Sequence, residues 1–370
     1  GPEMLTLEQL GMYSAQYERG EIDEKRLNWA KHNACPSCGA CSFIGTASTM
    51  QIMAGALGLA LPGSIVSAEA LKKLSAAGGI ILVGQVVEIN CDSELPYKVG
   101  DWVTGRPYFS CGICDNCRTG HESICEGGIK LMTLADEGNG AYAEYCKLPA
   151  KVVFPLREGI DLKIAALTEP LAVAVYDVRR SGLEPGQSVL ISGGGVIGGM
   201  IASYCKFLGA KVVVSEPNEN RIAFLKSLGI QAFNPMKENV SEEAKKWNGG
   251  KLFDVTFECC GAQASYDLCL NATRRGGTFM FVGVTTQNRE LYVRHVLVYQ
   301  MTIIGVNMYE TRDYYRATQI VNEGLMDEDL SKFVTHVYPL EDAYNAFMKA
   351  MDPEGKQVKV LLDCEVNHDK

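Results

Sequence analysis

The sequence predicts an α/β protein whose larger part is a doubly wound parallel sheet. From about residue 164 onward, stretches with helical periodicity alternate with short β-branched runs, the pattern of βαβ units with helices on both faces of a sheet. A glycine-rich turn joins one of these runs to the helix that follows it. The chain has 370 residues, which is longer than a domain with a single hydrophobic core usually is, so we expect a second domain beside the sheet.

Composition and charge narrow the range of partners. Hydrophobic residues make up 47% of the chain and charged residues 21%, as in an ordinary globular protein. The formal charge is −9 and no basic tract is present, so neither nucleic acid nor an anionic membrane is expected as a partner. The apolar run Ile52–Leu61 is too short to span a bilayer and ends at Pro62, and we interpret it as a buried helix.

The first two stretches of the chain differ in their predicted secondary structure. Residues 1–79 have helical patterns, interrupted by glycine and proline, and residues 80–159 turn to β-branched runs that predict strands. The predicted helices cover residues 5–19, 24–32, 49–61 and 68–75. The predicted strands cover residues 80–89, 100–103 and 142–153.

The remainder carries the alternating pattern and then two amphipathic helices. Helices are predicted over residues 164–180, 198–208, 221–228, 312–323 and 340–351, and strands over residues 188–192, 211–215, 255–258 and 359–363. We therefore divide the chain into a helical segment (1–79), a nucleotide-binding domain (160–308) and a second domain assembled from residues 80–159 and 309–370.

A dinucleotide-binding fingerprint follows the strand Ser188–Ser192. The residues 193–198 read G-x-G-x-x-G and open a helix, which is the context of a Rossmann turn. Gly193 permits the tight turn, Gly195 lets the backbone approach a diphosphate, and Gly198 lets the helix pack close to the strand. Val196 and Ile197 begin the helix, whose free N–H groups would face the phosphates. A glycine-rich turn that merely packs is the alternative.

A carboxylate at the end of the next strand selects the cofactor. Glu216 follows the strand Lys211–Ser215. A carboxylate there accepts hydrogen bonds from the adenosine ribose and repels a 2′-phosphate, which favours NAD over NADP. A solvated carboxylate at the strand end is the alternative for Glu216. Arg221 either stacks near the adenine or simply starts the next helix.

Four cysteines form a metal-binding pattern. Cys111, Cys114, Cys117 and Cys125 lie in a loop rich in glycine and polar residues. Four thiolates at this spacing can surround one tetrahedral zinc and leave no open position, so the site would be structural. Iron–sulfur ligation and free thiols are the alternatives. Because no export signal is evident, clustered cysteines favour metal ligation over disulfides, and we expect a cytoplasmic protein.

Residues 80–370 resemble the zinc-containing medium-chain alcohol and polyol dehydrogenases. The motifs that carry the resemblance are Gly100-Asp101-Trp102-Val103, Cys111-Gly112-Ile113-Cys114, Glu169-Pro170-Leu171, the glycine fingerprint, Phe257-Glu258-Cys259-Cys260-Gly261 and Arg275-Gly276-Gly277-Thr278. The resemblance implies hydride transfer between NAD and a secondary alcohol or polyol, with a catalytic zinc that polarises the alcohol oxygen. It also implies a Rossmann domain paired with a GroES-like barrel. Self-association through residues 301–307 would give a homodimer or homotetramer.

The sequence departs from that family at its catalytic zinc. The family's histidine and glutamate positions before the Gly100-Asp101 strand hold Ile80 and Ile81, which cannot bind a metal, and its early cysteine motif is absent. Glu169, the carboxylate that polyol dehydrogenases place beside this zinc, remains as the catalytic candidate. None of the five histidines stands at the expected position. We therefore expect an incomplete catalytic zinc site and slow or absent alcohol oxidation.

Residues 13–66 resemble the N-terminal part of dihydroxy-acid and sugar-acid dehydratases. The motifs are Tyr17-Glu18-Arg19-Gly20-Glu21-Ile22, Ala34-Cys35-Pro36-Ser37-Cys38-Gly39-Ala40-Cys41, Gly45-Thr46-Ala47-Ser48-Thr49-Met50 and Ala56-Leu57-Gly58-Leu59-Ala60-Leu61-Pro62-Gly63. In that family the cysteine that matches Cys41 ligates an iron–sulfur cluster. The family's other cluster cysteines, magnesium carboxylates and general base are missing, so Cys35, Cys38 and Cys41 are expected to be buried or oxidation-prone thiols, with metal binding as the alternative.

The join between the two resemblances lies at residues 76–79, where the predicted helices give way to strands. The first strands of the barrel would then be missing, and the barrel is expected to be incomplete. Three functions stay open: an NAD-dependent alcohol or polyol dehydrogenase, an NAD-binding protein without alcohol chemistry, and a dehydratase-like iron–sulfur lyase. Metal content separates them, because they predict about two zincs, one zinc, and iron with sulfide.

Overall fold

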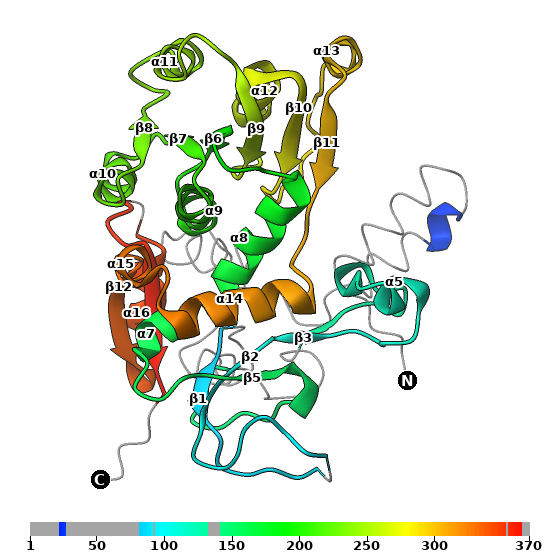
Figure 1. Ribbon diagram of the computed structural model, residues 1–370, viewed down its shortest axis with the longest axis vertical. Coiled ribbons are helices and arrows are strands. Elements are labelled where there is room, and N and C mark those ends of the chain that lie inside the picture. Colours follow the sequence, from blue (N-terminus) through cyan, green and yellow to red (C-terminus); the bar gives the residue numbers. More distant parts are fainter. Residues whose placement is uncertain (1–21, 27–80, 92, 132–140, 353, 365–370) are drawn as a thin grey trace.

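The computed structural model describes residues 22–26, 81–91, 93–131, 141–352 and 354–364 (Figure 1). Nearly all of the predicted helical segment 1–79, including Cys35, Cys38 and Cys41, lies outside the described residues, and so does Ile80. Among the described residues, no helix is both long enough and apolar enough to cross a membrane.

A six-stranded sheet with every neighbouring pair parallel forms the larger part of the molecule (Figure 1). The strand order is β11-β10-β9-β6-β7-β8, so the chain leaves the central strand β6 first toward one edge and later toward the other. This is the doubly wound arrangement that the sequence predicted. The strands are β6 (Ser188–Ser192), β7 (Lys211–Ser215), β8 (Gln231–Phe233), β9 (Phe253–Glu258), β10 (Thr273–Phe281) and β11 (Thr302–Gly305).

Alternate side chains of the central strands pack into two separate cores. On β6, Val189 and Ile191 belong to a large core that includes residues of α8 (Thr168–Ser181), α9 (Val196–Phe207) and α10 (Glu219–Ser227). Leu190, between them, belongs to a second core with residues of α11 (Val240–Trp247) and α12 (Gln263–Ala272). Because both faces are buried, the strands are continuous apolar runs, and each such side chain contributes roughly 1.5–3 kcal/mol.

The predicted helix 164–180 is two helices. α7 (Leu162–Ala165) is capped by Asp161, whose carboxylate accepts a hydrogen bond from Lys163 N–H, and α8 starts afresh at Thr168. Pro170 explains the break, because it has no N–H to donate to the carbonyl of Ala166 but is tolerated in the first turn of a new helix. The break places Glu169 in the first turn of α8.

α14 (Thr311–Glu323) crosses between the large sheet and the short strands β1, β2, β3 and β5, and β12 lies beside one end of this helix (Figure 1). A three-stranded antiparallel sheet contains β1, β2 and β5, β3 pairs with β4, and β12 pairs in parallel with β13. These strands are β1 (Val83–Gln85), β2 (Trp102–Gly105), β3 (Tyr108–Phe109), β4 (Lys130–Leu131), β5 (Val153–Pro155), β12 (Val334–Pro339) and β13 (Lys359–Asp363).

The predicted strand 142–153 is wrong for most of its length. The structure has no strand from residue 141 to residue 149, then a single 3₁₀ turn at Ala150–Val152, and β5 begins only at Val153. Pro149, which cannot donate to a ladder, precedes the turn. Residues 141–150 instead line a cavity.

α14 joins the two parts of the molecule through buried polar contacts. Arg179 of α8 donates two hydrogen bonds to the carboxylate of Asp313, at 2.7 and 2.8 Å. Tyr314, one residue further, donates to the carbonyl of Gly105 in β2 at 3.0 Å, and its hydroxyl lies 2.6 Å from that of Thr104. The α/β class is thus confirmed, whereas the division of the chain at residues 79, 159 and 308 stays a prediction.

Candidate functional site

The glycine turn after β6 leaves no room for side chains at two positions. Gly193 has φ +105°, and a Cβ built on it would lie 2.7 Å from Cys260 Sγ. A Cβ on Gly198 would lie 1.8 Å from the carbonyl oxygen of Gly193, so only glycine lets α9 approach the turn this closely. Gly193 therefore forms the tight turn, and Gly198 allows the close packing of α9, as the fingerprint predicts for these two positions.

The third glycine faces open space at the start of α9. Gly195 is the N-cap residue, with no side-chain cap, and a Cβ built on it would meet no atom within 4 Å. Val196 and Ile197 form the first turn of the twelve-residue helix, whose leading N–H groups have no partner from a capping side chain. An uncapped helix N-terminus beside free space fits the diphosphate of a dinucleotide.

Glu216 is fixed against this turn. Its side chain is 2% exposed, so the alternative of a solvated carboxylate is wrong. Oε2 accepts a hydrogen bond from Gly194 N–H at 2.7 Å, and Oε1 accepts one from Asn218 N–H at 2.9 Å. Each oxygen keeps a further lone pair that can accept a ribose hydroxyl. Sequence reasoning missed Gly194 and Asn218, although an asparagine before a helix is a known cap signal.

Arg221 does not start a helix. α10 begins at Glu219, and its N-cap is Asn218, whose side-chain oxygen accepts the N–H groups of Asn220 and Arg221. The guanidinium of Arg221 is partly exposed and lies 4.0 Å from Glu216 Oε2. It is therefore placed at the rim of the predicted ribose site.

The glycine turn lies where the strand order reverses. β6 and β9 are neighbours, with Ser192 paired to Glu258 at their carboxyl ends, and the N–H of Cys259 donates to the Ser192 carbonyl at 2.9 Å. Glu258 Oε1 accepts the N–H groups of Cys260 and Gly261, both at 2.7 Å, and so fixes the turn that follows β9. In open parallel sheets, ligands bind at this switch point.

Glu169 lies in a second polar centre. The hydroxyl of Tyr309 donates to Glu169 Oε1 at 3.2 Å. Burial raises the pKa of Glu169 to about 7, although the charge of Lys359 and the Tyr309 hydrogen bond both act to lower it. Burial also lowers the pKa of Lys359. Sequence reasoning found Glu169 but missed Tyr309 and Lys359, which are far away along the chain.

The described residues do not fit a second, catalytic zinc at Glu169. Among them, the one group of three or more histidine, cysteine or acidic side chains close enough to share a metal is the four-cysteine group, and Glu169 does not belong to it. Ile81, at a position where the family carries a polar residue, lines the large cavity. One carboxylate does not hold a zinc ion, so we derive no step through a metal at this centre.

The four predicted cysteines do come together. The ligand atoms of Cys111, Cys114, Cys117 and Cys125 all lie within 4.8 Å of one another, in the loop that contains α5 (Asp115–Arg118). The sulfur atoms of Cys111 and Cys117 are 3.9 Å apart. Zinc–sulfur bonds of about 2.3 Å in a tetrahedron require a separation of about 3.8 Å, so the arrangement fits zinc.

Backbone N–H groups already point at these sulfur atoms. Cys114 N donates to Cys111 Sγ at 3.4 Å, and Cys111 N donates to Cys125 Sγ at 3.4 Å. Hydrogen bonds from backbone N–H groups, that of Ile113 first, lower the pKa of Cys111 to about 6, whereas burial raises that of Cys117 to about 11.

The cysteine lobe (residues 111–125) is tied to the start of α14. Arg106 pairs with Glu122 at 3.1 Å, and Glu122 accepts both the N–H and the hydroxyl of Thr311, at 2.8 and 2.6 Å. Ser123 donates from its N–H and its hydroxyl to Glu310. Since Tyr309 directly precedes Glu310, the lobe holds the segment that supplies the partner of Glu169.

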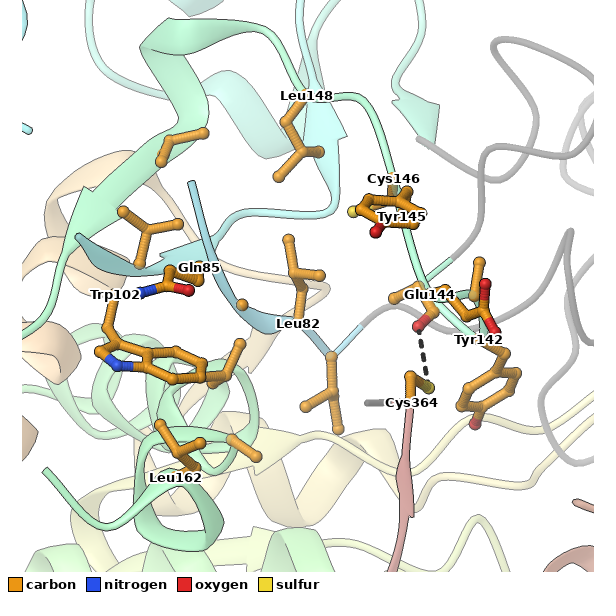
Figure 2. Close-up of a pocket in the computed structure, with 18 of the residues that line it drawn as sticks. Leu82, Gln85, Trp102, Tyr142, Glu144, Tyr145, Cys146, Leu148, Leu162 and Cys364 are labelled. Carbon is orange, nitrogen blue, oxygen red and sulfur yellow. Dashed lines mark hydrogen bonds between the residues drawn. The ribbon is translucent and has the colours of Figure 1, made fainter. Parts of the chain in front are cut away.

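A cavity of about 1210 Å³ is lined by Lys359 together with residues of β1, β2, 141–150, α7 and α16 (Ala343–Ala350), whereas Glu169 and Tyr309 do not line it. In Figure 2, Trp102 and Gln85 form one wall, Tyr142 and Cys146 stand on the opposite side, and Leu82 lies between them. The lining mixes apolar side chains with acidic and basic ones, so it suits a small molecule that is polar but not uniformly charged.

Three family models match parts of the chain. The zinc-binding dehydrogenase model matches residues 196–323, and the alcohol dehydrogenase GroES-like domain model matches residues 50–158. The N-terminal model of the dihydroxy-acid and 6-phosphogluconate dehydratases matches residues 2–90, so it overlaps the GroES-like match.

Full-length relatives agree with the two dehydrogenase matches. The chain is 31% identical over 361 residues to 2-dehydro-3-deoxy-L-galactonate 5-dehydrogenase of Pseudoalteromonas atlantica, covering 95% of this chain and 99% of the relative. It is similar to the solved structure of 2R,3R-butanediol dehydrogenase from Bacillus subtilis (27% identity, TM-score 0.69, 77% and 80% of the two chains). L-idonate 5-dehydrogenase from Escherichia coli is similar to the same degree (26%, TM-score 0.69, 77% and 81%).

Proposed function

Since the chain belongs to the zinc-containing medium-chain alcohol and polyol dehydrogenases, we propose that it transfers hydride between NAD and a secondary alcohol of a polyol or sugar acid. The chain is a zinc-type dehydrogenase of the NAD(P)-dependent class. The observation that carries the proposal is the open cradle at Gly195, at the uncapped start of α9 and beside the buried Glu216.

The cofactor preference rests on Glu216. The carboxylate of Glu216 is hydrogen-bonded to Gly194 N–H and lies 4.0 Å from the guanidinium of Arg221. The 2′-phosphate of NADP would be repelled by this buried carboxylate, and the one partly exposed guanidinium would offset that repulsion only in part, which supports NAD. The N–H groups of Val196 and Ile197 would bind the diphosphate. When bound, the nicotinamide supplies or accepts the hydride, and the residues of this chain hold and orient it.

The substrate class rests on two observations. Two relatives act, by their names, at position 5 of sugar acids, and a third acts on a vicinal diol. The cavity lined by Lys359 carries Gln85, Glu144 and Lys163 among apolar residues, which suits a hydroxylated carbon chain. We propose that the alcohol carbon lies at the end of the cavity nearest Glu169 and Lys359.

The cysteine lobe is the proposed zinc site. We propose one structural zinc on Cys111, Cys114, Cys117 and Cys125, supported by the 3.9 Å sulfur separation and the N–H groups aimed at the thiols. The finer expectation that alcohol oxidation through a catalytic zinc is slow or absent is supported by the missing donors around Glu169 among the described residues.

Assembly and location are also proposals. A homodimer or homotetramer through residues 301–307 is supported by β11, which is an edge strand of the large sheet, and by the adjacent α13 (Val293–Tyr299), where Leu297 is 75% exposed. A cytoplasmic location is supported by the free cysteines among the described residues.

The direct test is a carbonyl-reduction assay on the full chain. Purified protein with NADH is given ketones related to polyols and sugar acids, and NADH oxidation is followed. We expect turnover of at least one hydroxyketone, with NADPH used less well. A protein that binds NAD but reduces none of these compounds would support the alternative of an NAD-binding protein without alcohol chemistry.

A further inference from the structure

We propose that Glu169, held in place by the hydroxyl of Tyr309, exchanges a proton directly with the substrate oxygen, without a zinc ion held by the described residues around it. The inference rests on the proposed function and deepens it. Tyr309 acts as a positioning residue, and Lys359 as the neighbouring cation.

The topology brings this pair to the edge of the sheet that holds the glycine turn. Gly193 follows the last residue of β6, and Tyr309 follows the end of β11, Gly305, by four residues. The two strands belong to one parallel sheet, so both residues leave it at its carboxyl edge. A dinucleotide whose diphosphate lies on α9 would extend along this edge.

Tyr309 is fixed by its surroundings. It is 1% exposed, and its carbonyl oxygen accepts a hydrogen bond from the hydroxyl of Tyr108. Its ring centroid lies 5.5 Å from that of Tyr108 and 5.7 Å from that of Tyr314. A buried ring between two others has no alternative rotamer at low energy, so the direction of its hydroxyl toward Glu169 is set by packing.

The hydrogen bond leaves half of the carboxyl group available. Tyr309 donates to Oε1 of Glu169, and within the described part of the chain no other hydrogen bond to this side chain is found. Glu169 is only partly buried, and Lys359, which interacts with it electrostatically, lines the cavity proposed for the substrate. Oε2 can therefore face a substrate oxygen.

The electrostatic surroundings suit proton exchange near neutral pH. Among the described residues, the charged and titratable groups that interact with Glu169 are Tyr309, Tyr314 of α14 and Lys359 of β13. Burial raises the pKa of Glu169 to about 7, and both tyrosines have raised pKa values and stay protonated. A carboxyl group with a pKa near the working pH can both donate and accept a proton efficiently.

The chemistry balances without a metal. In the direction of reduction, the carbonyl carbon receives the hydride that the reduced nicotinamide supplies, and the π electron pair of the carbonyl moves to its oxygen. Glu169 Oε2–H breaks as the proton moves to that oxygen, which gives the alcohol, oxidised nicotinamide and a carboxylate. The carboxylate then takes a proton from solvent. Oxidation runs the same steps in reverse, starting from the Glu169 carboxylate.

The test combines three variants with four measurements. Glu169→Gln removes the proton, Tyr309→Phe removes the hydrogen bond, and Tyr315→Phe on the exposed side of α14 is the matched control, since Tyr315 is 55% exposed. The first measurement is the pH dependence of kcat/KM for NADH-dependent reduction. The other three are infrared titration of the Glu169 carboxyl band without substrate, the zinc content and the Kd for NAD.

We expect reduction by the wild type to fall as pH rises through about 7, because the protonated form of Glu169 is the donor. Glu169→Gln should lose about 100-fold or more in kcat with an unchanged Kd for NAD. Tyr309→Phe should move both the kinetic and the infrared midpoints to higher pH, because the lost hydrogen bond favoured the carboxylate. Tyr315→Phe should match the wild type, and zinc content should stay at one per chain in all four proteins.

Two kinds of result separate the inference from the function on which it rests. A wild type that reduces no carbonyl overturns the proposed function and the inference with it. Turnover that survives Glu169→Gln, infrared midpoints that do not move in Tyr309→Phe, or activity that disappears when a second zinc is removed and returns with Zn²⁺ overturns the inference alone.

Discussion

Replacing either of two glycines of the turn with alanine adds the same methyl group, but the two variants should differ in opposite ways in stability and in NAD affinity. Gly195 has an ordinary extended conformation (φ −68°, ψ −168°), and its built Cβ meets no atom within 4 Å. Gly195→Ala should therefore fold with a free energy of unfolding within about 0.5 kcal/mol of the wild type. Its methyl group projects into the cradle, so the Kd for NAD should rise at least about tenfold, or about 1.4 kcal/mol.

Gly198→Ala should do the reverse. The built Cβ lies 1.8 Å from the Gly193 carbonyl oxygen and 3.0 Å from its carbon, and both are backbone atoms that cannot rotate away. α9 must shift from β6, which should cost about 1–3 kcal/mol of stability or more. A loss of that size lowers Tm by several degrees in a protein of this length.

The assay is urea or thermal unfolding of the two variants beside calorimetric titration with NAD. Two outcomes would contradict these expectations: Gly195→Ala binds NAD as tightly as the wild type, or Gly198→Ala unfolds at the wild-type midpoint. Either result would show that the turn does not hold the diphosphate or that α9 does not pack on it as described.

Three further predictions concern the lobe, the junction and the sheet. Cys114→Ser should lose one zinc per chain by elemental analysis and lower Tm, whereas unchanged zinc content excludes the lobe as the site. Arg179→Met leaves the carboxylate of Asp313, 1% exposed, without its ion pair, and should cost about 3 kcal/mol in urea unfolding; a change below 1 kcal/mol contradicts this. Burial acts to raise the pKa of Asp254, but hydrogen bonds from Ser188 and Arg274 outweigh it and hold that pKa below its ordinary value. Its contribution to stability is thus present above about pH 4 and lost as pH falls further, so Asp254→Asn should destabilise at pH 7 but much less at pH 3.

Local sequence patterns were enough to predict the large parallel sheet and the glycine turn. β6, β7 and β13 have the predicted bounds, and in β6 and β7 a buried apolar run rich in β-branched residues ends at a glycine or an acidic residue. The four cysteines were found because lobe ligands are close in sequence. The helix 164–180 was predicted without its break, although Pro170 was visible, since periodicity alone does not show where a helix restarts.

The rest depends on contacts that no local pattern contains. Tyr309 and Glu169 are 140 residues apart, and only the path of β11 and α14 brings them together. The buried carboxylate of Glu216 accepts hydrogen bonds from the backbone N–H groups of Gly194 and Asn218, which lie in two different connections between strand and helix. The strand 142–153 was predicted from local composition, which does not show whether a strand has a neighbour, and residues 141–149 pair with no strand of the described chain.

The central claim is that the turn from Gly193 to Gly198, faced by Glu216, holds NAD. Calorimetric titration of the full chain with NAD and with NADP tests it most directly. We expect one NAD per chain, bound at least about tenfold more tightly than NADP, and a smaller difference in Glu216→Ser. Absence of NAD binding, or tighter binding of NADP than of NAD, would contradict it.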